Sequence, residues 1–192
     1  MQVQSVSKGL FCYMESSKWL NCYSPTPLTE RTIFIVTMCS IDSSSKKTGI
    51  AIYKNGKYTS HKLLDCSKDK IMDSRFKKMA LDILNTLNEI KPNIIYIEET
   101  VVLRNAQTQR FLTRLQGVVY AWCIQNNCEF NTIRPSSWRK AINLKQNKNI
   151  KREQLKQEAI DYVKEKYNIE VNDDIADAIC IGDAVLNLFN ID

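Results

Sequence analysis

The segment IFIVTMCSIDSSSKKTGIAIY, residues 33–53, decides the fold of this chain. Its first part, Ile33 to Ile41, is an apolar run rich in β-branched residues, which predicts a buried strand that ends at Asp42. A short polar turn follows, and Thr48 to Tyr53 then predicts a second strand. The sequence therefore begins its folded part with two strands joined by a tight connection.

The pattern downstream of this segment predicts an α/β protein. Asn55-Gly56 indicates a hairpin, so Tyr58 to Leu64 becomes a third strand. Helical and strand patterns then alternate, which predicts a mixed five-stranded sheet with helices on both faces. Right-handed crossovers would place the ends of the first and fourth strands side by side. The remaining predicted elements are a helix over 71–90, a strand over 93–97, a helix over 106–126, a strand over 130–133, a short helix from Pro135, and helices over 150–167 and 173–189.

Length and composition indicate one folded domain. The chain has 192 residues, of which 44% are hydrophobic and 25% charged, as in ordinary globular proteins. Residues 1–32 lack apolar periodicity, so we expect a poorly ordered N-terminal extension before a domain over 33–192. No apolar run is long enough to span a membrane. Seven cysteines without a C-x-x-C pair, and no secretory signal, predict a cytoplasmic location, with a mitochondrial presequence as the weaker alternative.

Charge is distributed unevenly along the second half of the chain. Overall there are 27 Lys and Arg against 21 Asp and Glu, a net charge of +6. Residues 134–166 carry ten basic and four acidic side chains, whereas residues 167–192 carry six acidic and no basic ones. A basic segment of this kind suits a polyanionic partner, although it is also typical of a solvated helix face.

Four carboxylates are predicted to converge at one edge of the sheet. Asp42 and Glu98 each end a predicted strand, and functional groups gather at the carboxyl ends of strands in open α/β sheets. Asp174 and Asp177 are three residues apart on the last helix, so they share a face. We expect Asp173 to cap this helix and Asp183, half a turn from Asp174, to face solvent.

Clustered carboxylates without histidine or cysteine predict a site for hard divalent cations. Such a set favours Mg²⁺ or Mn²⁺ over Zn²⁺, and two ions about 3.5–4 Å apart would suit phosphodiester hydrolysis. The chain contains one histidine, so acid–base chemistry based on histidine would depend on His61 alone. No Walker loop is present, which disfavours nucleotide hydrolysis of that type.

These motifs together resemble the RuvC family of Holliday-junction resolvases, within the RNase H-like fold. The matching pieces occur in family order, from Ile33 to about Phe189, and each alone is short. They are Ile41-Asp42 with Thr48-Gly49, Ile97-Glu98, Asn105-Ala106 with Gln116-Gly117-Val118, and Asp174-Ile175-Ala176-Asp177-Ala178. The resemblance implies that Asp42, Glu98, Asp174 and Asp177 are the catalytic acids and bind two Mg²⁺ or Mn²⁺ ions. It also implies a homodimer that holds a four-way DNA junction and nicks two strands symmetrically.

The resemblance also indicates residues for DNA contact and the places where this chain departs from the family. It places one of Arg139 and Lys140, and one of Lys151 and Arg152, near the scissile phosphate, without fixing which. Ser43 stands where many members have proline, and Val101 where bacterial members have a phenylalanine used on the junction. Arg104, Asn105, Arg110 and Arg114 follow the Glu98 strand and could track a DNA backbone, although the last two also suit a solvated helix face.

Several alternatives remain open from the sequence. Trp138 could stack on a base, but its apolar neighbours favour a core position. An apolar stripe on the helix over 106–126 predicts either a dimer interface or packing on the chain's own sheet; its members are Phe111, Leu115, Val118, Val119 and Trp122. The protein could also be a non-catalytic RNase H-like module that binds nucleic acid, or a nuclease acting on RNA or RNA–DNA hybrid.

Overall fold

The structure is a computed structural model that describes residues 36–100, 105–145 and 150–189. The predicted N-terminal extension, together with residues 33–35 of the predicted first strand, lies outside these ranges. The elements are β1 (Thr37–Ser43), β2 (Lys47–Lys54), β3 (Lys57–Asp65), α1 (Met72–Ile90), β4 (Ile94–Glu98), α2 (Ala106–Gln125), β5 (Glu129–Ile133), α3 (Pro135–Ala141), α4 (Arg152–Tyr167) and α5 (Asp173–Phe189).

The strands form one mixed sheet in the order β3-β2-β1-β4-β5. The first three strands pair antiparallel, whereas β4 pairs parallel with β1 and β5 pairs parallel with β4. Ile41 of β1 lies opposite Ile97 of β4, so the residues that follow them, Asp42 and Glu98, leave the same edge of the sheet. The predicted fold class and the adjacency of the first and fourth strands are confirmed.

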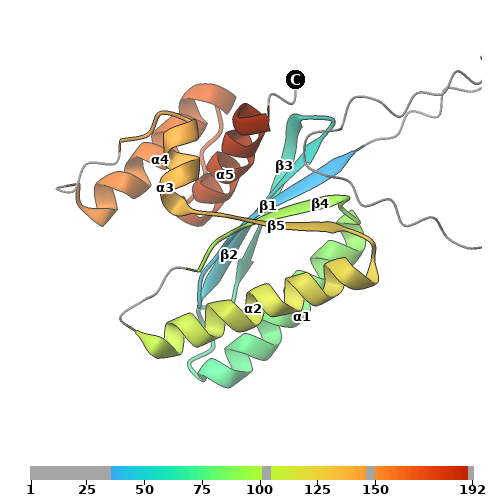
Figure 1. The fold of residues 1–192 in the computed structure, drawn as a ribbon. Coiled ribbons are helices and arrows are strands. Elements are labelled where there is room, and N and C mark those ends of the chain that lie inside the picture. Colours follow the sequence, from blue (N-terminus) through green and yellow to red (C-terminus); the bar gives the residue numbers. More distant parts are fainter. Residues whose placement is uncertain (1–35, 101–104, 146–149, 190–192) are drawn as a thin grey trace, which may run out of the picture. The chain divides into compact units, whose positions relative to one another are not determined.

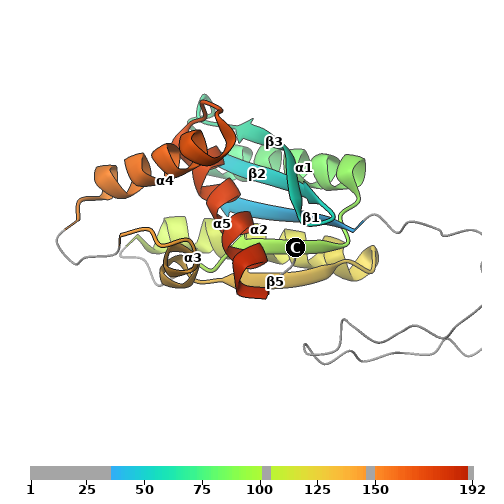
Figure 2. The same ribbon diagram turned by 90° about the horizontal axis from the view of Figure 1, so that it is seen from above.

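Helices cover both faces of the sheet, as Figures 1 and 2 show. Helices α1 and α2 pack on one face over a core that includes Ile83, Leu87, Leu115 and Val119. Helices α3, α4 and α5 lie on the other face, and α5 crosses β1 and β2. No helix in the described ranges is long and apolar enough to cross a membrane.

Alternation along β1 and β4 determines which face carries the acidic residues. Cys39 and Ile41 of β1 belong to the core beneath α1 and α2, whereas the hydroxyl of Ser40 donates to the Ala178 carbonyl of α5 at 2.7 Å. Side chains two residues apart in a strand share a face, so Asp42 points to the α5 side like Ser40. The same alternation in β4 places Glu98 on the face shared with Tyr96, away from Ile97.

Two glycines allow α5 to approach the sheet closely. A Cβ atom on Gly49, which pairs with Asp42 across β1 and β2, would lie 2.0 Å from the Asp174 carbonyl oxygen. A Cβ atom on Gly182 would lie 2.2 Å from the ring of Tyr53. Any larger residue at either position would push α5 away from the strands that carry the acidic site.

Asp183 is buried, and the prediction that it faces solvent is wrong. The residue is 1% exposed, and its carboxylate accepts hydrogen bonds from three tyrosine hydroxyls and the Lys166 ammonium. The tyrosines are Tyr53 at 2.9 Å, Tyr162 at 3.0 Å and Tyr167 at 2.6 Å. Tyr53 belongs to β2, and the other three partners belong to α4. Asp183 therefore connects α5 to the sheet and to its neighbouring helix.

The apolar stripe predicted on α2 packs inside the chain. Phe111, Leu115, Val119 and Trp122 are all buried against the sheet and α1. Trp122 also donates its indole N–H to the Asn88 side chain of α1 at 2.7 Å. The stripe is therefore part of the chain's own core, and it does not by itself indicate a dimer interface.

Candidate active site

Acidic side chains from three elements line one cleft at the carboxyl edge of β1 and β4. Asp42 lies near the end of β1, Glu98 is the last residue of β4, and Asp174 and Asp177 occupy the first turns of α5. The cleft has a volume of about 730 Å³. Its lining also includes Ser43, Ser44, Ser45, Lys46, Glu99, Thr100, Thr108, Leu112, Pro135, Arg139, Arg152, Leu155, Lys156 and Asp173. The structure thus brings together the four acids that the sequence singled out.

The start of α5 is capped by Asn172, not by Asp173 as predicted. The Asn172 side-chain oxygen accepts a hydrogen bond from the backbone N–H of Ile175 at 3.1 Å, and the helix itself begins at Asp173. Asparagine is among the preferred N-cap residues because its oxygen satisfies an unpaired backbone N–H. Asp173 is therefore free of the capping role and pairs instead with Lys156 of α4.

Burial perturbs the two acids that end the strands, and neighbouring carboxylates add to the effect at Asp42. Burial raises the pKa of Asp42 well above its ordinary value, and the carboxylates of Glu98, Asp177 and Asp174 raise it further. Burial also raises the pKa of Glu98, while a hydrogen bond from Trp138 and the charge of Arg139 act to lower it. Such shifts mean that the site without a bound cation disfavours the ionised form of both carboxyl groups.

The acids on α5 show the same effect. Burial raises the pKa of Asp177 to about 7, with Arg139 opposing the shift and Glu98 adding to it. The pKa of Asp174 is also raised by burial and by the neighbouring Asp173. Partial burial acts to raise the pKa of Asp173, but the hydrogen bond and charge of Lys156 outweigh it and leave that pKa below its ordinary value.

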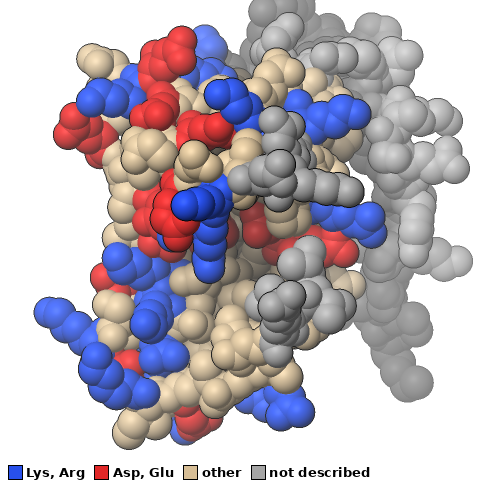
Figure 3. All heavy atoms as spheres, turned by 90° about the vertical axis from the view of Figure 1, so that its left-hand side faces the viewer, with Lys and Arg blue, Asp and Glu red and all other residues tan. Residues whose placement is uncertain are grey.

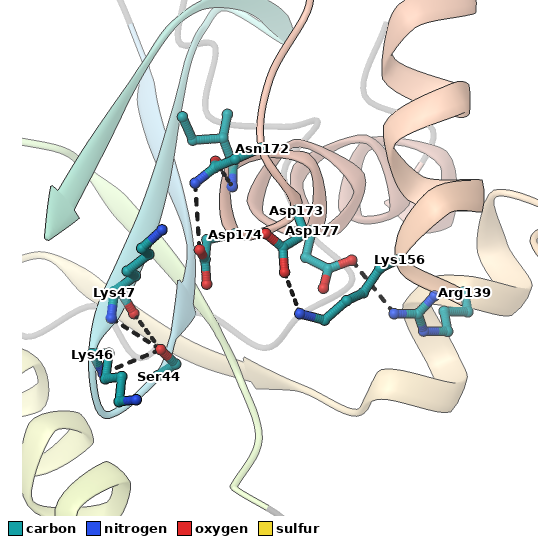
Figure 4. Close-up of polar contacts among 10 residues, drawn as sticks. Ser44, Lys46, Lys47, Arg139, Lys156, Asn172, Asp173, Asp174 and Asp177 are labelled. Atoms are coloured by element: carbon teal, nitrogen blue, oxygen red, sulfur yellow. Dashed lines mark hydrogen bonds and ion pairs between the residues drawn. The ribbon is translucent and has the colours of Figure 1, made fainter. Parts of the chain in front are cut away.

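Two basic side chains enter the cleft from α3 and α4 (Figure 4). Arg139 contacts Asp177, with 3.4 Å between its Nη2 and the Asp177 Oδ1, and its side chain is only 13% exposed. Lys156 forms an ion pair with Asp173. In the space-filling view of this face, lysine and arginine side chains lie beside a group of acidic ones (Figure 3). The cleft therefore combines a concentrated negative charge with cations at its rim.

Glu98 is held at both its backbone and its side chain. Its carbonyl oxygen accepts a hydrogen bond from the Gln116 side-chain amide of α2 at 2.8 Å. Its Oε2 accepts a hydrogen bond from the indole N–H of Trp138 at 2.8 Å. The neighbouring Glu99 is exposed to the cleft and pairs with Arg134 at 2.9 Å. Trp138 is fully buried, which confirms the predicted core position, but its contact with Glu98 was not predicted.

The predicted DNA-binding residues occupy different kinds of position. Arg139 and Arg152 line the cleft, whereas Lys140 and Lys151 are exposed outside its lining. Asn105 caps α2, because its side-chain oxygen accepts from the backbone N–H groups of residues 107 and 108 at 3.0 and 3.1 Å. The predictions for Arg104 and Val101 lie outside the described residues.

Sequence reasoning missed two basic residues that line the cleft. Lys46 lies in the turn between β1 and β2, and Lys156 lies one turn into α4. Lys46 follows a run of three serines directly after Asp42, so its proximity to the acid was available from the sequence. The position of Lys156 depends on how α4 packs against α5, which no local pattern in the sequence reveals.

The donor set of the cleft fits a hard divalent cation. Carboxylate oxygens are the ligands that Mg²⁺ and Mn²⁺ prefer, and a bound cation would relieve the repulsion that raises the pKa of Asp42. Among the described residues, no three His, Cys, Asp or Glu side chains are already grouped tightly enough to hold an ion. The four acids line the same cleft, but their carboxylate groups do not surround a single point.

Comparisons with known proteins agree with this arrangement. The sequence profile of one protein family, described as crossover junction endodeoxyribonuclease RuvC, matches residues 38–184. The structure of Thermus thermophilus RuvC in complex with Holliday junction substrate aligns with a TM-score of 0.62 and 13% identity, covering 81% of this chain and 96% of that chain. The yeast mitochondrial Holliday junction resolvase Ydc2 aligns with a TM-score of 0.53 and 16% identity, covering 80% and 78%. At these identities the structural matches establish the fold. None of the curated protein sequences compared with the chain matches it.

Proposed function

Because the chain belongs to the RuvC family of crossover junction endodeoxyribonucleases, which are metal-dependent nucleases, we propose that its acidic cleft cleaves branched DNA. The proposed reaction is phosphodiester hydrolysis on four-way junctions, by paired nicks in two strands. The observation that carries the proposal is that Asp42, Glu98, Asp174 and Asp177, with their raised pKa values, line one cleft.

In this proposal, the four carboxylates bind two Mg²⁺ or Mn²⁺ ions. When bound, the ions would supply Lewis acidity and an activated water for attack on the phosphate. The protein's own contribution is to hold the carboxylates in position, and the positive charge of the bound ions would favour their ionised form. Asp42 and Glu98 are fixed by the strand ends, and Asp174 and Asp177 by the first two turns of α5.

Arg139 and Arg152 are the proposed phosphate contacts near the scissile bond. Both line the acidic cleft, and an arginine side chain donates several hydrogen bonds in a plane that matches a phosphate. Lys46 and Lys156 lie at the same cleft and would add sequence-independent attraction. Lys140 and Lys151 lie outside the cleft lining, so we propose that they contact phosphates farther from the scissile bond.

We further propose that the active form is a homodimer. A four-way junction with two symmetric nicks requires two active sites in a fixed relation, which a closed two-fold dimer supplies most simply. The mass of the purified protein, measured by light scattering at micromolar concentration with and without junction, tests this part. A monomer in both states that still nicks opposite strands in concert would contradict it.

The function is tested by a cleavage assay on end-labelled substrates of one length. Four-way junction, flap, linear duplex and RNA–DNA hybrid are compared, each with Mg²⁺, with Mn²⁺ and with EDTA. We expect cleavage of the junction in two opposite strands, which EDTA abolishes. Preferential cleavage of the hybrid, or binding of all substrates without cleavage, would favour the two alternative functions considered from the sequence.

A further inference from the structure

Trp138 touches the acidic site from the core side of α3. The side chain is fully buried, and its indole N–H donates to the Oε2 of Glu98 at 2.8 Å. An indole has one donor and no acceptor, so this hydrogen bond can be made only to an oxygen that offers a lone pair. The carboxylates of this site repel one another. The hydrogen bond from the indole holds the Oε2 atom of Glu98 next to the buried Trp138 ring.

The same indole supports the basic residue next to it. The guanidinium carbon of Arg139 lies 4.2 Å from the centroid of the Trp138 ring, a distance typical of a cation–π contact. Arg139 in turn lies 3.4 Å from Asp177 and donates to the Leu155 carbonyl of α4 at 3.4 Å. One buried ring is thus connected to acids on two elements, to Glu98 through its edge and to Asp177 through the arginine on its face.

We propose that Trp138 is a positioning residue of the metal site. Its N–H restricts the rotation of the Glu98 carboxylate, and its ring face restricts the position of Arg139. This inference rests on the proposed function, because it assigns Glu98 to metal binding. Hydrogen bonds to metal-binding carboxylates orient them, and losing such a bond typically lowers metal affinity or activity by about 10-fold to 100-fold.

The alternative is that Trp138 serves only to fill the core. Trp138 packs with α4 and α5 in the core on that face of the sheet, so truncating it would lower stability whether or not it orients Glu98. The test must therefore remove the N–H while keeping the ring. Replacing residue 138 by 3-benzothienylalanine does so, since sulfur takes the place of the indole N–H in a ring of the same shape. Trp138→Phe is the second variant.

Trp122→Phe is the matched control. Trp122 is also buried, at 5% exposure, and its indole N–H also donates to a side-chain oxygen, that of Asn88 at 2.7 Å. It belongs to the core beneath α1 and α2, and it is not part of the cleft lining. The control therefore loses a buried indole hydrogen bond of the same kind without touching the carboxylates.

The readouts are Mn²⁺ binding without DNA, followed by electron paramagnetic resonance, and junction cleavage as a function of Mn²⁺ concentration. We expect both variants at residue 138 to raise the Mn²⁺ dissociation constant by about 10-fold or more. The benzothienyl variant keeps the ring face beneath Arg139, so its junction affinity should stay unchanged. The control should bind Mn²⁺ as the wild type does. Thermal melting of each protein identifies the temperature at which all are folded.

The outcomes separate this inference from the proposed function. If the wild type and Trp122→Phe bind Mn²⁺ and cleave, and the benzothienyl protein binds Mn²⁺ equally well, the positioning role is refuted and the function stands. If the wild type itself neither binds Mn²⁺ nor cleaves, the proposed function fails and the positioning role fails with it.

Discussion

Replacing Asp183 by alanine should destabilise the protein severely while leaving the acidic cleft without a direct change. The substitution removes the acceptor shared by the hydroxyls of Tyr53, Tyr162 and Tyr167 and leaves the Lys166 ammonium without its carboxylate partner. Asp183 is 1% exposed, so water cannot replace the lost oxygen atoms without opening the core.

The expected loss follows from this geometry. A buried donor left without an acceptor costs about 1–3 kcal/mol. Tyr162 and Tyr167 lose their acceptor, whereas Tyr53 also donates to the Ile179 carbonyl and the Lys166 side chain is 42% exposed, so the expected loss is about 2–6 kcal/mol. One kcal/mol corresponds to a shift of about 2–4 °C in the melting temperature for a domain of this size. We therefore expect Asp183→Ala to melt roughly 4–24 °C below the wild type. Asp183→Asn keeps the volume and one acceptor oxygen, so its melting temperature should lie between the two.

The measurement is thermal unfolding followed by circular dichroism at neutral pH, with Asp161→Asn as the matched control. Asp161 lies on the exposed side of α4 and accepts a side-chain hydrogen bond from Gln157 at 2.8 Å. The control should melt within about 2 °C of the wild type, as is usual for exposed substitutions. If Asp183→Ala melts as close to the wild type as the control does, the buried network contributes nothing and this reasoning is refuted.

Four further predictions follow from the site and the sequence. Asp42→Asn should abolish junction cleavage and leave junction binding within about twofold, as measured by gel shift, because binding depends on Lys and Arg. Gly49→Ala should destabilise the protein by about 1–3 kcal/mol in a denaturant titration and reduce cleavage, because its methyl group would collide with the Asp174 carbonyl. The pKa of Asp177 is near 7 in the folded protein and about 3.8 when unfolded, so the folded state binds the extra proton between these values. This contribution to stability is present below about pH 4 and is lost as the pH rises through 7. The metal-free protein should accordingly gain more from Mn²⁺ at pH 8 than at pH 6 in a melting assay, and Asp177→Asn should reduce that difference. Finally, a chain starting at Arg31 should retain a single cooperative melt, since residues 1–32 carry too little apolar periodicity to be needed for folding.

The fold could be predicted from sequence because its decisive features are local. The run that ends at Asp42, the Asn55-Gly56 turn and the helical spacing over 71–90 each specify one element. The strand adjacency followed from the handedness of crossovers, and the structure has it. Asp42 could be grouped with Glu98 from the predicted ends of the two strands and from the adjacency of these strands, because parallel neighbouring strands end at the same edge of a sheet.

The contacts that tune the site could not be predicted because they join residues far apart in the chain. The indole of Trp138 meets Glu98 across 40 positions, and Lys156 meets Asp173 across 17. Each contact depends on the angle at which α3 or α4 packs on the sheet. The sequence showed a basic segment over 134–166, but no pattern within it separates Arg139 and Arg152, which line the cleft, from Lys140 and Lys151, which do not.

Asp183 shows how a correct spacing led to a wrong conclusion. It lies nine positions after Asp174, which places the two on opposite sides of α5. In the structure that opposite side meets Tyr53 of β2 and Tyr162 of α4, so the spacing itself is compatible with a buried aspartate. A buried carboxylate needs donors, and those of Asp183 lie between 16 and 130 positions away in the chain, so no local pattern revealed them. One helix therefore uses its acids in two ways: Asp174 and Asp177 remain without enough donors and are suited to a cation, whereas Asp183 has its donors supplied by the protein and holds the helix in place.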